Sequence, residues 1–138
     1  TFHIKDGLGI KMWQRAGFRF GILTARTSHI VKVRSAELGI DIVRQGFESK
    51  LPTAETLAKS MNLGLEEVCY IGDDLTDLPV IRAVGLGVAV ADAVGELLES
   101  ADLVTDTAGG QGAVRELIET ILRSTGRWDD LVQQYYSA

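Results

Sequence analysis

The stretch "YIGDDLTDLP", residues 70–79, places three carboxylates within five positions, at Asp73, Asp74 and Asp77. The apolar run "VCYI" (68–71) comes before them, separated by a single glycine. Like charges this close together raise one another's pKa and cost stability unless a positive charge compensates them. The stretch therefore predicts a buried strand that ends at an acidic cluster, and this cluster either has a positive charge elsewhere in the chain as its partner or faces water.

The composition is typical of one globular domain with a packed apolar core. The chain has 138 residues, of which 46% are hydrophobic and 24% charged, and its mean hydropathy is +0.11. A net charge of −5 disfavours broad binding to nucleic acids or anionic membranes. No apolar run reaches the roughly 20 residues of a membrane span. Cys69 is the only cysteine, which excludes an internal disulfide. We expect a cytoplasmic protein without nucleic-acid or membrane partners.

Short apolar runs alternate with longer amphipathic stretches along the whole chain. The alternation predicts an α/β fold in which helices flank a parallel sheet. Continuous apolar runs indicate strands that are buried on both faces. The expected strands are 18–23, 40–43, 68–71, 86–90 and 103–104, and the expected helices are 7–16, 28–38, 53–62, 77–84, 94–100 and 112–123.

Polar side chains follow three successive expected strands. Thr24 follows the first strand, Lys50 the second and Asp73 the third. Ligands of open parallel sheets bind beyond the carboxyl ends of the strands, so we expect these side chains to converge. Mg²⁺ prefers oxygen ligands and keeps several waters, so one or two carboxylates suffice. Asp73 is the candidate direct ligand, with Asp74 beside it.

Each of these residues also has a simpler structural interpretation. Asp74 and Asp77 fit the cap and the first turn of the next helix. Thr24 fits the cap of a turn, or a phosphate ligand together with the backbone N–H groups around Ala25. Arg26 fits either a phosphate or a solvated surface. Arg115, which follows the Gly-rich segment "GGQG", fits either the carboxylate of a substrate or an ordinary helix start. Only the combination favours a phosphate site.

Three segments together resemble motifs of the haloacid dehalogenase superfamily of phosphohydrolases. They are "ILTAR" (22–26), "SKLPTAETL" (49–57) and "YIGDDLTDLP" (70–79), which look like its second, third and fourth motifs. The segments 4–12, 72–93 and 101–119 are similar to small phosphatases that act on 3-deoxy-D-manno-octulosonate 8-phosphate. The resemblance covers the chain up to about residue 125.

This resemblance implies a capless, Rossmann-like enzyme of lipopolysaccharide biosynthesis. Its activity would be Mg²⁺-dependent hydrolysis of a phosphorylated keto sugar acid through an aspartyl-phosphate. Thr24, Ala25, Arg26, Lys50 and Arg115 would then bind the substrate. Thr24, Lys50 and Asp77 would take part in catalysis, and Asp73 and Asp74 would hold the metal. The expected assembly is a homotetramer.

The sequence departs from the family pattern at its start. The family's first motif, DxDG, carries the nucleophile and is absent from the 138 residues, where Asp6 in "KDGLG" is the nearest imitation. We therefore expect residues 1–125 to form an N-terminally incomplete core whose central strand is missing. "TFHI" (1–4) would be the end of a hairpin strand. The tail, 126–138, carries an apolar stripe that could dock on a neighbouring subunit or fold back.

Two alternatives to a phosphatase follow from this departure. One is a catalytically inactive, oligomeric scaffold that binds phosphate or metal without turnover. The other is the phosphatase-like domain of a fusion to a nonulosonate cytidylyltransferase. An aspartate nucleophile outside these residues would support catalysis.

Overall fold

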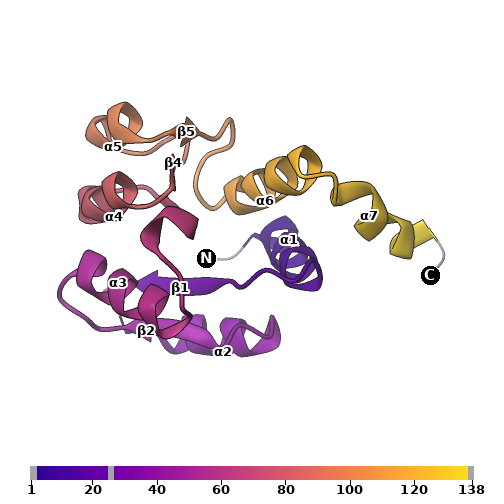
Figure 1. Ribbon diagram of the computed structural model, residues 1–138, viewed down its shortest axis with the longest axis horizontal. Helices are drawn as coiled ribbons and strands as arrows, with labels where there is room; N and C mark the ends of the chain where they lie inside the picture. The colour runs from indigo at the N-terminus through magenta and orange to yellow at the C-terminus, as the bar shows by residue number, and fades with distance from the viewer. Residues whose placement is uncertain (1–2, 25–26, 137–138) are drawn as a thin grey trace.

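The computed structural model describes residues 3–24 and 27–136, in which helices and short strands alternate (Figure 1). The helices are α1 (Ile4–Arg15), α2 (His29–Glu37), α3 (Lys50–Ser60), α4 (Leu78–Ala83), α5 (Gly95–Ser100), α6 (Ala113–Ser124) and α7 (Trp128–Tyr136). The strands are β1 (Gly21–Thr24), β2 (Ile42–Gln45), β3 (Cys69–Gly72), β4 (Leu86–Ala89) and β5 (Leu103–Val104). Two 3₁₀ turns, η1 (Leu65–Glu67) and η2 (Leu75–Asp77), flank β3.

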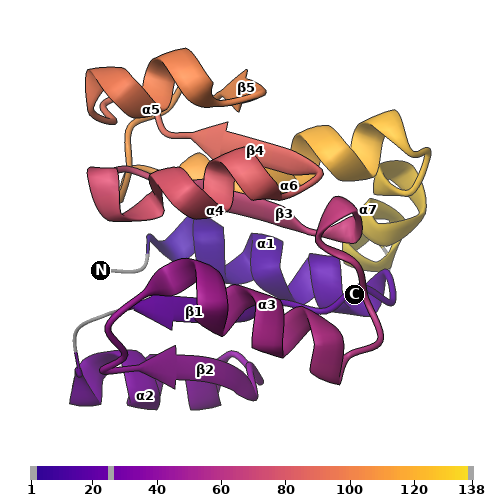
Figure 2. The same ribbon diagram turned by 60° about the vertical axis from the view of Figure 1, so that its left-hand side comes forward.

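The strands form two separate parallel sheets. β1 pairs with β2, with Gly21 opposite Ile42, whereas β3, β4 and β5 form a second sheet in that order. Within the described residues no strand pairing joins β1 to β3, and the ribbons show a break in the sheet there (Figure 2). The expected α/β fold is confirmed, and the break lies where a missing central strand was expected.

Three groups of buried apolar side chains hold the helices on the sheets. The largest joins α1, α6 and α7 to the β1–β2 sheet, the second surrounds the β3–β4–β5 sheet, and the third packs α3 on α4 with Leu23 of β1 and Tyr70 of β3 beside them. Members of the first group include Ile10, Met12, Ile118, Leu122 and Trp128; the second includes Ile81, Ala89 and Leu97; the third includes Ala54, Val80 and Val84. The apolar side chains of the predicted helices and strands are therefore largely the ones buried in the core.

Caps and glycines set several helix ends where the sequence predicts them. The Ser28 hydroxyl accepts a hydrogen bond from the Val31 N–H and caps α2. Gly17 and Gly39 follow α1 and α2 with φ of 93° and 72°, a conformation that favours glycine. The expected start of α1 at residue 7 is wrong. His3 caps the helix through Nδ1 and Ile4 is helical, so the strand interpretation of "TFHI" fails for the described part of that segment.

The first two strands begin later than predicted, for reasons of packing. Phe18 stacks on Trp13, with ring centroids 4.5 Å apart, and the Trp13 indole N–H donates to the Arg19 carbonyl. Residues 18–20 therefore fold back along α1 before β1 begins. Ile40 donates its N–H to the Ser35 carbonyl, so it closes α2 and does not start β2.

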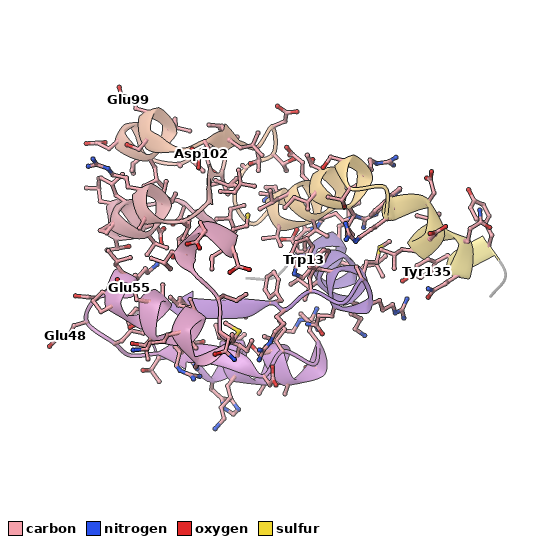
Figure 3. The ribbon with its side chains drawn as sticks, viewed as in Figure 1. Trp13, Glu48, Glu55, Glu99, Asp102 and Tyr135 are labelled. Atoms are coloured by element: carbon pink, nitrogen blue, oxygen red, sulfur yellow. The ribbon has the colours of Figure 1, made fainter. Side chains whose placement is uncertain are left out.

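The C-terminal segment folds back on its own chain. Trp128 and Leu131 of α7 are buried against the core group that contains Ile10 and Met12, and the Arg15 guanidinium donates to the Tyr135 hydroxyl at 2.8 Å. Figure 3 labels Tyr135 on α7, beside α1. Of the two interpretations of the apolar stripe, the structure therefore supports the intramolecular one. No helix in the described ranges is both long and apolar enough to span a membrane.

Candidate active site

Asp77 is the centre of a hydrogen-bond cluster at the carboxyl end of β3. Its side chain is only 3% exposed, and its Oδ1 accepts from Lys50 Nζ and from the Tyr70 hydroxyl, each at 2.6 Å. Its Oδ2 accepts from the backbone N–H groups of Asp73, at 2.9 Å, and Asp74, at 3.2 Å. The cation required by the acidic stretch is thus Lys50, supplied by the first turn of α3.

The cluster settles which of its groups is charged at neutral pH. Burial raises the pKa of Asp77, but hydrogen bonds from Lys50, Tyr70 and two backbone N–H groups hold it below its ordinary value. Burial, followed by the hydrogen bond to Asp77, raises the pKa of Tyr70 far above neutrality. Asp77 is therefore the ionised acceptor, and Tyr70 keeps its proton as a donor.

Gly72 allows the acidic loop to close over the end of β3. A Cβ at Gly72 would lie 2.6 Å from Cβ and Cγ of Asp77, too close for any side chain. Asp74 caps the turn η2, because its Oδ1 accepts from the Leu75 N–H at 2.7 Å. The capping interpretation of Asp74 is therefore correct, although one oxygen in a cap does not prevent the other from binding a ligand.

Asp73 has the donor chemistry that Mg²⁺ requires. Asp73 is exposed, whereas the carboxylate of Asp77 already accepts hydrogen bonds from four donors. Burial and the neighbouring Asp77 charge raise the pKa of Asp73, so a bound cation would relieve real repulsion. No set of three His, Cys, Asp or Glu side chains gathers as a metal site in residues 3–24 and 27–136. Mg²⁺ fits nevertheless, because it keeps several waters beside one or two carboxylates.

The remaining phosphate candidates lie at the end of β1. Thr24 is the last residue of that strand, opposite Gln45 of β2. The Gln45 Oε1 accepts from the Ser28 N–H at 2.7 Å and so ties the N-terminal cap of α2 to the end of β2. Ala25 and Arg26 lie outside the described residues. Glu48, two residues before Lys50, points away from the molecule (Figure 3).

Arg115 is engaged in packing between α6 and α7. Its guanidinium carbon lies 5.4 Å from the centre of the Trp128 ring, and its Nε lies 3.4 Å from Glu119 Oε1. Its backbone N–H donates to Asp6, which is 4% exposed. A role for Arg115 in substrate binding stays a prediction, and Asp6 serves the start of α6.

Tyr70 is the site residue that sequence reasoning missed. It was counted only as part of an apolar strand, although a buried tyrosine hydroxyl normally needs a hydrogen-bond partner. That requirement, with an acidic stretch directly after the strand, was the signal available in the sequence.

Comparison with known proteins places the chain in a family. The profile of the haloacid dehalogenase-like hydrolases matches residues 20–118. The chain is 42% identical over 130 residues to the 3-deoxy-D-manno-octulosonate 8-phosphate phosphatase KdsC of Escherichia coli K12, covering 94% of this chain and 69% of that protein.

The chain belongs to the haloacid dehalogenase-like hydrolase family. This confirms the expected family. At the level of the family it also confirms the expected enzyme class, a phosphoric monoester hydrolase.

Solved structures of the family agree with this assignment. The phosphatase of Moraxella catarrhalis, in complex with a magnesium ion, a phosphate ion and a KDO molecule, matches with a TM-score of 0.95 at 36% identity. The match covers 98% of this chain and 78% of that one. The cobalt-bound phosphatase of Haemophilus influenzae matches with a TM-score of 0.88 at 40% identity, over 91% and 74% of the two chains. Both of these proteins, whose folds match that of this chain, were solved with a divalent metal ion bound.

Proposed function

We propose that the protein hydrolyses the phosphate ester of a phosphorylated keto sugar acid, with 3-deoxy-D-manno-octulosonate 8-phosphate as the leading substrate and Mg²⁺ as cofactor. The observation that carries the proposal is the Lys50–Asp77 pair at the end of β3, beside the exposed Asp73. A fixed ammonium next to an exposed carboxylate suits a site for a phosphate ester and a metal ion. The named relatives support the choice of substrate.

The proposal gives each of the candidate site residues described above a separate role. Lys50, oriented by Asp77, neutralises charge on the phosphoryl oxygens as the ester bond breaks. Thr24 donates its hydroxyl to one of those oxygens. Asp73, with the second oxygen of Asp74, would hold Mg²⁺, which when bound reduces the repulsion between carboxylates and phosphate. Asp77 has no exposed oxygen to offer a substrate, so its contact with Lys50 suits positioning better than proton transfer.

The attacking carboxylate is not assigned to any residue of this chain. The family's DxDG motif is absent from the sequence, and Asp6 is buried under α6 with its oxygen on the Arg115 N–H. The proposal therefore concerns the native protein, in which an aspartate from outside these residues attacks phosphorus. The alternative function is a catalytically inactive scaffold, and an assay of phosphate release distinguishes it from a phosphatase.

Release of inorganic phosphate from a panel of esters tests the proposal. The panel contains 3-deoxy-D-manno-octulosonate 8-phosphate, a nonulosonate 9-phosphate and glucose 6-phosphate, each with Mg²⁺ and with EDTA. We expect turnover of the keto acid esters that EDTA abolishes. The native protein with Asp73→Asn should lose at least tenfold in turnover, whereas Asp129→Asn, a change on the exposed side of α7, should not. Binding of phosphate or Mg²⁺ without turnover would identify the scaffold instead.

A homotetramer is part of the same proposal. Size-exclusion chromatography with light scattering on the native protein measures the assembly directly. A monomer at micromolar concentration would remove the tetramer from the proposal and leave the chemistry untouched.

A further inference from the structure

Tyr70 reaches the acidic loop from β3 on a side chain that is held in place by packing. Its backbone pairs with Gly87 of β4, and its ring packs against the core groups that contain Leu97 and Val80. A tyrosine ring has few rotatable bonds, so a packed ring holds its hydroxyl in one place. This hydroxyl donates to Asp77 Oδ1 at 2.6 Å. The strand therefore supplies a fixed donor to the buried carboxylate.

The two oxygens of Asp77 are bound from different sides. Oδ1 accepts from Tyr70 and from Lys50 Nζ, each at 2.6 Å. Oδ2 accepts from the backbone N–H groups of Asp73 and Asp74 in the acidic loop. The torsion that turns an aspartate carboxylate has broad preferences of its own, so hydrogen bonds set its orientation. Tyr70 thus fixes the oxygen that receives the ammonium, and the loop fixes the other oxygen.

The Lys50 ammonium takes its position from this Oδ1 oxygen. The ammonium lies at the end of a long flexible stem, which by itself holds the charge loosely. Lys50 begins α3 and Asp77 ends η2, so one carboxylate joins a helix to the loop that follows a strand. A rotation of the Asp77 carboxylate would therefore carry the ammonium away from its place.

We propose that Tyr70 is a positioning residue, whose hydroxyl fixes the Asp77 carboxylate and through it the Lys50 ammonium. The inference rests on the proposed function, in which Lys50 acts on a phosphate ester. Loss of the hydroxyl leaves the ammonium charge in the site but removes its fixed position. Attraction of the bound ester needs the charge, whereas stabilisation of the transition state also needs its exact placement. The missing hydroxyl should therefore lower kcat more than it raises KM.

Steady-state kinetics of the native protein and its Tyr70→Phe variant test the proposal. The substrate is the keto acid ester that the native protein turns over fastest, with Mg²⁺, and phenylalanine keeps the packed ring. We expect kcat to fall at least tenfold. KM and the Mg²⁺ concentration that gives half the maximal rate should stay within twofold, because Asp77 Oδ2 keeps both of its N–H donors in the acidic loop.

The matched control is Tyr135→Phe. It removes another hydrogen-bonded hydroxyl, the one that accepts from Arg15 at α7, and should leave kcat unchanged. A Tyr70→Phe variant that loses stability in urea but keeps its kcat would make the hydroxyl merely structural and would overturn the proposal. A rise in KM without a fall in kcat would overturn it as well.

Crystal structures of the native protein and of Tyr70→Phe test the position of Lys50 without turnover. We expect the variant to show a rotated Asp77 carboxylate and a Lys50 Nζ displaced by about 1 Å or more, with the backbone at Asp73 in place. Lys50 and Asp77 side chains that superpose in the two structures would overturn the proposal. A native protein without turnover would contradict the proposed function alone, and the two structures would still decide the role of Tyr70.

Discussion

The carboxylate of Asp6, on α1, accepts a hydrogen bond at 2.9 Å from the backbone N–H of Arg115, which lies in the first turn of α6, 109 residues further along the chain. The first N–H groups of a helix have no partner within it, so a carboxylate from another helix can act as the cap. Gly112, at the start of α6, has no side chain with which to cap it. One acidic residue therefore ties the first helix to the sixth.

Removing this cap should destabilise the fold. We expect Asp6→Ala to lower the free energy of unfolding by about 1–2 kcal/mol, since a buried N–H loses its acceptor. Asp6→Asn keeps an acceptor oxygen and should cost less. Urea unfolding measures both, with the exposed Asp41→Ala as control. Equal stability of Asp6→Ala and the unaltered chain would show that water replaces the cap.

Removing the Lys50 ammonium alone should lower the free energy of unfolding more than removing the charges of both Lys50 and Asp77. The Lys50 side chain is 15% exposed and that of Asp77 only 3%, so Lys50→Met leaves a buried charge unpaired. We expect a loss of about 3–5 kcal/mol for that variant. The double variant Lys50→Met with Asp77→Asn should recover part of this loss. A double variant less stable than Lys50→Met would argue against an unpaired charge as the cause.

Glu116 should make the stability depend on acid pH. Burial raises its pKa, but hydrogen bonds from the Thr107 hydroxyl and from the N–H groups of Asp106 and Thr107 hold it below its ordinary value of 4.5. A carboxylate with a lowered pKa in the folded state stabilises above its unfolded pKa, and this contribution is lost as the pH falls through the folded value. Glu116→Gln should therefore be less stable than the unaltered chain at pH 7, with the difference shrinking below pH 4.5.

Thermal unfolding between pH 7 and pH 3 measures the effect of Glu116. Glu99→Gln is the control, because Glu99 is exposed and points outward from α5 (Figure 3). A difference between Glu116→Gln and the unaltered chain that stays constant across this range would exclude the carboxylate charge as its source.

The single thiol of the chain should react slowly. Burial raises the pKa of Cys69 from its ordinary value of 9.0 to about 11. The reactive thiolate is then about 100-fold scarcer at pH 8 than in a free cysteine, so alkylation by iodoacetamide should slow by about that factor. Mass spectrometry of the folded and urea-unfolded chain compares the two rates. Equal rates would mean that Cys69 is as accessible and as acidic as a free thiol.

The order of the elements was predictable from the alternation of short apolar runs with longer amphipathic stretches. The predicted ends of the first two helices, at residues 16 and 38, agree with the structure to within one residue, and Gly17 and Gly39 follow them. The break between β1 and β3 lies where a missing central strand was expected. Strand starts were misplaced where tertiary contacts override the local pattern. The Trp13 indole N–H donates to the Arg19 carbonyl, and the Ile40 N–H donates to the Ser35 carbonyl. Hydrophobic periodicity predicts neither hydrogen bond.

The chemistry of the site was predictable in its residue types and less so in their tasks. The convergence of Lys50 with the acidic stretch was predicted from their places after successive strands, and the structure shows Lys50 paired with Asp77. The separate tasks of Asp73, Asp74 and Asp77 depend on which carboxylate is buried, and three acids in five positions look alike in sequence. Burial distinguishes them, because only Asp77 is enclosed.

The division of the apolar interior into separate groups has a consequence for unfolding. The third group bridges the two sheets, because Ala54 of α3 packs with Val80 of α4, and Leu23 of β1 and Tyr70 of β3 lie against them. Lys50 begins α3 and Asp77 directly precedes α4, so their ion pair lies at the end of this bridge. A local opening between α3 and α4 would therefore break the apolar contact and the ion pair together, and the free energy of that opening sets how long the Lys50 ammonium stays in position.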